Sequence, residues 1–298
     1  MFARHLLAAT FAVVLTPQLY AQDADYKRDK DVVYGRRGKT DLTMDVFTPK
    51  KAANKAGVIL CVSGDFKSGR GLLDAVHPLA TRELLKRGYV VFAVTHISQP
   101  TCSVPEIVDD VHRSVRFVKA NAANYGVRPD RLGMAGASSG GCLSLLMGCA
   151  GRAGDPKAAD PVDRESSKVA AVACFFPVTD FLAFEANPPK GFDGLFPFHE
   201  RDPLTGKVVK ITAERRREIG KLCSPLHCAT RDAVPTFIIH GDADELVPLK
   251  QSELLIDKLR KYKVECSLDV KPGMGHSALA ASVHLPQLAN WFDKYLAK

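Results

Sequence analysis

The chain has 298 residues, of which 46% are hydrophobic and 25% charged, and its formal net charge is +8. These values are ordinary for a soluble globular protein, and they exclude a disordered, collagen-like or coiled-coil chain. The positive charges are scattered, and the densest basic cluster, Arg215-Arg216-Arg217, is flanked by glutamates as on a solvated helix face. We therefore expect no nucleic-acid partner.

The N-terminal segment, residues 1–21, is typical of a signal peptide. Arg4 lies near its start, residues 6–15 are almost wholly apolar, and Ala21 is a suitable last residue before cleavage. The apolar run is shorter than the roughly 20 residues that a membrane-spanning helix needs, so we expect no stable membrane anchor. A buried N-terminal helix is the alternative. The first interpretation predicts a secreted or periplasmic protein whose mature domain is residues 22–298.

Short apolar stretches then alternate with stretches of helical periodicity. We expect an antiparallel edge hairpin at residues 42–47 and strands at 58–62, 89–94, 132–135, 170–176, 235–240 and 264–270. Helices are expected at residues 72–86, 104–124, 143–150, 249–262 and 279–296. This alternation predicts a single α/β domain with a mostly parallel central sheet and helices on both faces.

One long segment, residues 181–224, interrupts this alternation and is rich in proline, glycine, phenylalanine and charge. Its length and position predict a cap or lid over the sheet edge, and a surface insertion that only packs is the alternative. Packing within the lid is also the favoured interpretation of its phenylalanines, namely Phe181, Phe184, Phe192, Phe196 and Phe198.

The sharpest motif is Gly136-Ala137-Ser138-Ser139-Gly140-Gly141, which follows an expected strand and precedes an expected helix. This is the context of a GxSxG elbow, in which a tight turn needs small neighbours and exposes the serine hydroxyl above the sheet. The N-terminus of the following helix favours an anion at the same place. The motif therefore predicts Ser138 as a nucleophile.

A nucleophilic serine needs a base that an acid orients, and in this motif both come later in the chain. His276 follows the last expected strand in a glycine-rich turn, so we expect it to be the base. The acid is expected directly after the strand at 235–240, where Asp242 and Asp244 are the two candidates. Both places lie at the carboxyl ends of strands, where open α/β sheets hold their sites.

With these residues the sequence resembles the α/β-hydrolase superfamily over nearly all of the mature chain. The resemblance is carried by residues 136–141, 239–248, 275–276 and 224–227. It is closer to acetylxylan/feruloyl-esterase-like and hormone-sensitive-lipase-like serine esterases, with prolyl oligopeptidase-like relatives. It implies an α/β-hydrolase fold with Ser138 as nucleophile, His276 as base and Asp244 as the acid.

The sequence departs from these relatives in the oxyanion hole, the pair of N–H donors that stabilises the reaction's anion. Relatives carry a glycine run after the early strand, whereas this chain has Val62-Ser63-Gly64-Asp65-Phe66. We expect the backbone N–H groups of Gly64, Asp65 and Ser139 to serve, since backbone donors do not depend on side chains. An Asp65 carboxylate pointing inward would disfavour the anion. His96 and Phe66 are further candidates for the substrate pocket.

No cofactor or metal is expected, because the sequence has no CxxC, HExxH or acidic metal-binding loop, and its one P-loop-like stretch, residues 64–70, lacks the Lys-Ser/Thr pair. A disulfide between Cys223 and Cys228 is plausible in an exported protein, while Cys61, Cys142, Cys149 and Cys174 are expected to be buried thiols.

The expected function is that of a secreted serine hydrolase that cleaves carboxylic esters through a Ser138 acyl-enzyme. Its partner would be a small-molecule or carbohydrate ester. A serine peptidase of the oligopeptidase type is the first alternative, and a weakly active hydrolase-fold binding protein is the second.

Overall fold

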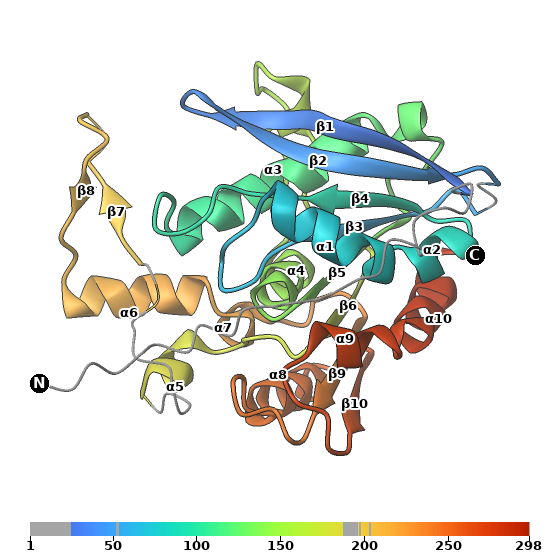
Figure 1. The fold of residues 1–298 in the computed structure, drawn as a ribbon. Coiled ribbons are helices and arrows are strands. Elements are labelled where there is room, and N and C mark those ends of the chain that lie inside the picture. Colours follow the sequence, from blue (N-terminus) through green and yellow to red (C-terminus); the bar gives the residue numbers. More distant parts are fainter. Residues whose placement is uncertain (1–24, 52–53, 187–195, 197, 203, 298) are drawn as a thin grey trace, which may run out of the picture.

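An eight-stranded sheet forms the centre of the molecule in the computed structural model (Figure 1). The structure describes residues 25–51, 54–186, 196, 198–202 and 204–297, so the expected signal peptide lies outside the described residues. The strand order is β1-β2-β4-β3-β5-β6-β9-β10. β2 pairs antiparallel with both of its neighbours, β1 and β4, and all other neighbouring strands in this order pair parallel. The strands are β1 Tyr26–Arg37, β2 Thr40–Pro49, β3 Gly57–Cys61, β4 Val90–Val94, β5 Leu132–Ala137, β6 Ala171–Phe175, β9 Thr236–Gly241 and β10 Cys266–Lys271.

Both faces of the sheet are buried, because alternate residues of its central strands enter two separate cores. Along β3, Ile59 and Cys61 belong to the core that also contains residues of α3, α4 and α8, whereas Val58 and Leu60 belong to the core of α1, α2 and α10. The helices are α1 Arg70–Ala80, α2 Arg82–Lys86, α3 Val104–Ala120, α4 Ser139–Ala150, α5 Phe181–Ala186, α6 Ala213–Leu222, α7 Pro225–Cys228, α8 Lys250–Lys261, α9 Ala278–Ser282 and α10 Leu285–Leu296.

The predicted parallel sheet with helices on both faces is confirmed, and the expected strands are shifted by at most two residues at either end. Three helices that the periodicity predicts as continuous are each broken in the structure. The segment 104–124 ends as α3 at Ala120, and a 3₁₀ turn follows at Ala122–Tyr125. The segment 72–86 divides after Ala80, at Thr81, whose hydroxyl and N–H both donate to the His77 carbonyl of α1. The segment 279–296 divides between α9 and α10, and Pro286 occupies the first turn of α10.

The segment expected to form a cap contains α5, α6 and the short hairpin of β7 Glu200–Arg201 and β8 Val208–Val209, which extends away from the sheet (Figure 1). Four of its phenylalanines, Phe181, Phe184, Phe196 and Phe198, pack against one another, as the packing interpretation expects. Phe192 lies outside the described residues.

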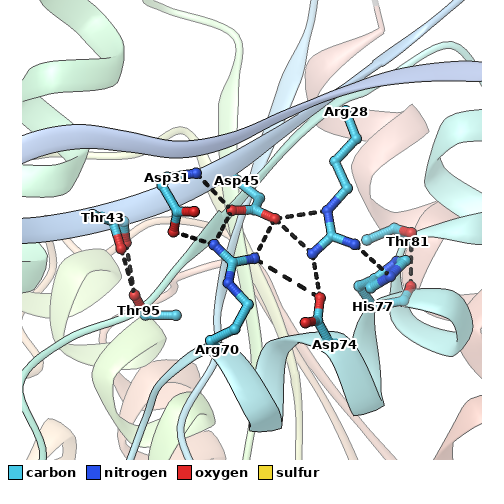
Figure 2. A network of polar contacts seen from close by, with 9 residues as sticks. All are labelled: Arg28, Asp31, Thr43, Asp45, Arg70, Asp74, His77, Thr81 and Thr95. Carbon is cyan, nitrogen blue, oxygen red and sulfur yellow. Dashed lines mark hydrogen bonds and ion pairs between the residues drawn. The ribbon is translucent and has the colours of Figure 1, made fainter.

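A charge network joins the β1–β2 hairpin to α1 (Figure 2). Asp45 on β2 is fully buried and accepts hydrogen bonds from Arg28 at 2.7 Å and from Arg70 at 2.7 and 2.8 Å. The same two guanidinium groups also pair with Asp31 and Asp74. Since Arg70 is the first residue of α1, this network fixes the end of the loop that connects β3 to α1.

All eight cysteines are free thiols in this structure, so the disulfide expected between Cys223 and Cys228 is not formed. Cys61, Cys142, Cys149 and Cys174 are buried, as expected, and burial raises the pKa of each thiol. Within the described residues, every helix is too short or too polar to span a lipid bilayer.

Candidate active site

Ser138 lies in a sharp turn between β5 and α4, with φ 55° and ψ −122°. This left-handed conformation is rare for a residue with a side chain and is held by very close backbone packing. A Cβ atom on Gly136 would lie 2.4 Å from the backbone of Gly140, and one on Gly140 would lie 2.5 Å from the Cys61 carbonyl oxygen. Only glycine therefore fits at either position, as the motif predicts.

Asp244 and His276 form a close pair in the loops that follow β9 and β10. The Asp244 Oδ2 accepts a hydrogen bond from His276 Nδ1 at 2.7 Å, and its Oδ1 accepts from the backbone N–H groups of Leu246 and Val247 at 3.0 and 2.8 Å. Asp242, the other candidate acid, is exposed and accepts from the Gly273 N–H instead. The structure thus pairs His276 with Asp244.

The Asp244 carboxylate stays ionised although its side chain is buried. Burial by itself would raise its pKa, but hydrogen bonds from His240 and His276 and the backbone N–H of Val247 outweigh that effect and hold the pKa well below its usual range. A fixed negative charge beside Nδ1 keeps the proton on that nitrogen, which leaves Nε2 as the basic atom of His276.

His240 is a residue of the site that sequence reasoning does not single out. Its ring is fully buried, with Nε2 2.8 Å from the Val247 carbonyl and 3.4 Å from Asp244 Oδ2, and with Nδ1 2.7 Å from Ser252 Oγ. His240 therefore helps to hold the loop between Asp244 and Val247 in place. Its place at the end of β9, two residues before the first candidate acid, is the only signal in the sequence.

The serine and the acid–base pair lie at the same end of the sheet, because each follows the carboxyl end of one of the parallel strands β5, β9 and β10. Between them, the Ser138 N–H donates to the Phe175 carbonyl at 3.0 Å, and the ring of the next residue, Phe176, lies 4.3 Å from the His276 ring. Among the described contacts no hydrogen bond joins the Ser138 hydroxyl to His276. The structure thus brings the three predicted residues to one place without linking the hydroxyl to the base.

The expected oxyanion donors differ in their availability. The Gly64 N–H donates to the Lys67 carbonyl at 2.9 Å, so the expectation for Gly64 is not met, because its donor is already used in a turn. The N–H groups of Asp65 and Ser139 have no partner within the described part of the chain. The Asp65 carboxylate pairs with Lys67 Nζ at 3.0 Å and is 61% exposed, so it lies in solvent and not against a developing anion.

Neither candidate pocket residue is freely exposed. Phe66 is 1% exposed and packs against Phe181 and Phe196, so it belongs to the core, and its place in a substrate pocket stays a prediction. His96 is also buried, with its Nε2 2.9 Å from Ser63 Oγ. It contributes to the wall of a cavity of about 300 Å³, together with Thr43 of β2 and Ser68 of the loop after β3.

A larger cavity of about 790 Å³ lies between α3, the end of α4 and the cap segment. Along α4 its wall begins at Leu146, eight residues or about 12 Å beyond Ser138, so this cavity does not adjoin the elbow. Within the described residues, no group of three histidine, cysteine, aspartate or glutamate side chains could hold a metal ion.

A model of the BD-FAE family matches residues 44–259 of the chain. Among similar curated proteins, the probable carboxylic ester hydrolase LipM of Mycobacterium tuberculosis is 29% identical over 240 residues, which cover 80% of this chain and 53% of LipM. The esterase LipQ of the same organism is 27% identical over 232 residues, covering 77% of this chain and 52% of LipQ. The chain thus spans about half the length of these relatives.

Solved structures show the same fold. A truncated carbohydrate esterase from gut microbiota has a TM-score of 0.72 at 23% identity, over 93% of this chain and 99% of that one. An acetyl ester-xyloside bifunctional hydrolase from Caldicellulosiruptor lactoaceticus has a TM-score of 0.71 at 21% identity, over 89% and 95%. Together with the strand order, this likeness shows that the predicted α/β-hydrolase fold is correct.

Proposed function

The chain belongs to the BD-FAE family, and we propose that it is a serine hydrolase that cleaves carboxylic esters through an acyl-enzyme on Ser138. The observation that carries the proposal is the hydrogen bond between the buried Asp244 and the partly exposed His276, at the end of the sheet that also bears the serine elbow. The esterase names of the similar curated proteins support the reaction class.

In the proposed reaction, His276 Nε2 takes the proton of the Ser138 hydroxyl while the oxygen attacks the ester carbonyl. The imidazolium that forms is stabilised by Asp244. The N–H groups of Ser139 and Asp65 donate to the oxyanion, and His276 then gives its proton to the departing alkoxide. Water activated by the same imidazole hydrolyses the acyl-enzyme and restores the serine.

The proposed substrate is an acylated carbohydrate or a similar small ester outside the cytoplasm. The carbohydrate esterase and the acetyl ester-xyloside hydrolase of the same fold support this class, and the signal-peptide pattern in residues 1–21 supports export. The position of the Asp65 carboxylate in solvent removes the main reason to expect a weakly active binding protein.

A fluorophosphonate probe tests the nucleophile, because it modifies only an activated serine. We expect the wild-type protein to be labelled and Ser138→Ala not to be labelled, with Ser144→Ala, a change elsewhere on α4, as the matched control. Equal labelling of wild type and Ser138→Ala, or no labelling of either, would overturn the proposal.

Substrate class and export need separate measurements. We expect acetate release from acetylated xylo-oligosaccharides and faster turnover of p-nitrophenyl acetate than of peptide p-nitroanilides, and the reverse order would favour a peptidase. N-terminal sequencing of the protein from the medium or periplasm is expected to begin at Gln22. Retention of residues 1–21 in a protein confined to the cytoplasm would refute export.

A further inference from the structure

The loop that follows β3 contains a strained two-residue turn. Gly64 and Lys67 exchange two backbone hydrogen bonds of 2.9 Å, which places Asp65 and Phe66 at the tip with φ values of 51° and 53°. This left-handed geometry suits asparagine or glycine and is rare for a bulky residue such as phenylalanine. Such a turn persists only where its surroundings hold it in place.

A chain of hydrogen bonds connects this turn to the serine elbow. The Phe66 N–H lies 3.1 Å from Ser139 Oγ, Ser139 Oγ lies 3.0 Å from Ser63 Oγ, and Ser63 Oγ lies 2.9 Å from His96 Nε2. The other ring nitrogen, His96 Nδ1, is 3.0 Å from the Ile97 carbonyl. We call this series, from Phe66 to His96, the hydroxyl chain.

The hydroxyl chain has one consistent direction. A carbonyl oxygen only accepts, so His96 Nδ1 carries the proton and donates to Ile97. Burial lowers the pKa of His96 to about 4, so the neutral ring presents an acceptor at Nε2. Ser63 therefore donates to His96, Ser139 donates to Ser63, and the Phe66 N–H donates to Ser139. Each hydroxyl then accepts one bond and donates one.

Ser139 connects both parts of the oxyanion hole. Its N–H is one proposed donor, and its side chain fixes the turn whose N–H at Asp65 is the other. The contact is close, because the backbone of Gly140 approaches the Cys61 carbonyl so nearly that no side chain fits between α4 and the end of β3. The elbow and the turn are therefore held together by the hydroxyl chain and by direct backbone packing.

We propose that Ser63, His96 and the Ser139 hydroxyl are positioning residues that hold the Asp65–Phe66 turn in register with the elbow, so that both N–H groups meet the same oxyanion. The proposal rests on the ester hydrolysis proposed above and deepens it. In this chain, side-chain hydroxyls and a buried imidazole hold the turn in place.

The test compares Ser63→Ala and Ser139→Ala with Ser63→Thr, which keeps the hydroxyl, and with Ser114→Ala. Ser114 is a matched control, because its hydroxyl is fully buried on α3 and, among the described residues, bonds only the Val111 carbonyl at 2.8 Å. Each variant is assayed for kcat and KM on p-nitrophenyl acetate, for affinity toward an aryl trifluoromethyl ketone, and for melting temperature. The ketone forms an anionic adduct on the serine and so reports on the oxyanion hole.

We expect both alanine variants of the hydroxyl chain to lose roughly tenfold to hundredfold in kcat, with KM changed less than about twofold. Ketone affinity should fall by the same factor. A variant that carries both Ser63→Ala and Ser139→Ala should have a kcat no lower than that of the more impaired single variant, because the same hydroxyl chain is broken in each case. Ser63→Thr and Ser114→Ala should keep at least half of the wild-type kcat.

Two outcomes overturn the proposal while the ester hydrolase stands. In one, the wild type is active and the Ser63→Ala and Ser139→Ala variants keep their kcat and ketone affinity. In the other, they lose activity only as far as Ser114→Ala does, in step with melting temperature. A wild type that neither turns over the ester nor binds the ketone overturns the proposed function together with this inference.

Discussion

Replacing Asp244 with asparagine should abolish most of the proposed activity without unfolding the protein. The N–H groups of Leu246 and Val247 hold Oδ1 at 3.0 and 2.8 Å, so the carbonyl oxygen of an asparagine would occupy that position. Its amide nitrogen would then face His276 Nδ1, where the carboxylate now accepts at 2.7 Å. An amide NH₂ only donates, so His276 would carry its proton on Nε2 and could not accept the serine proton.

The expected loss is roughly 10⁴-fold in kcat, or about 5 kcal/mol of transition-state stabilisation, the size typical for a wrongly protonated base in such a triad. Steady-state hydrolysis of p-nitrophenyl acetate measures it, and circular dichroism verifies the fold. Asp242→Asn is the control, because this exposed carboxylate bonds only the Gly273 N–H in the described structure and should leave kcat unchanged. More than a tenth of wild-type activity in Asp244→Asn, or an equal loss in Asp242→Asn, would refute the reasoning.

Three further changes test other parts of the structure. Gly140→Ala places a Cβ 2.5 Å from the Cys61 carbonyl oxygen, so we expect about 2 kcal/mol of destabilisation in thermal melts and at least a tenfold fall in ester turnover, and wild-type behaviour would show that the elbow can relax. Asp45→Asn leaves two arginines around an uncharged centre, so urea titrations should show a loss of about 3–5 kcal/mol, against under about 1 kcal/mol for the half-exposed Asp74→Asn. Burial, with the charges of two nearby arginines, lowers the pKa of His112 to about 3 against about 6.5 in an unfolded chain, so the unfolded state takes up the proton first. Stability is then complete above pH 6.5 and falls on acidification, by about 2 kcal/mol at pH 5, and urea midpoints at pH 7 and 5 should differ less in His112→Gln; an identical pH dependence would contradict this assignment.

Local patterns in the sequence predict the parts of this protein that are local in origin. Strands that are buried on both faces must be continuously apolar, which is why β3, β4 and β6 can be recognised in the sequence as short apolar runs. The elbow needs glycines at fixed offsets from Ser138, and the base must follow the last strand, so chain order alone points to His276.

Other features depend on pairings across the sheet. β1 is not predicted, because this edge strand is half exposed and carries charges, and its partner β2 gives the only pattern of the hairpin. The choice of Asp244 over Asp242 depends on which of two carboxylates, only two positions apart, a turn directs toward His276. No periodicity records that direction.

The sequence by itself determines the α/β alternation, the glycine-flanked serine turn and the chain order of the proposed acid and base, since each follows from neighbouring residues and chain order. Only the tertiary structure decides that Gly64 uses its N–H within a turn, that Phe66 is buried, and that Ser139 bonds a backbone group 73 positions away. The physical reason is that a hydrogen bond needs a partner within about 3 Å, and which distant residues come so close is settled by the packing of α4 against β3.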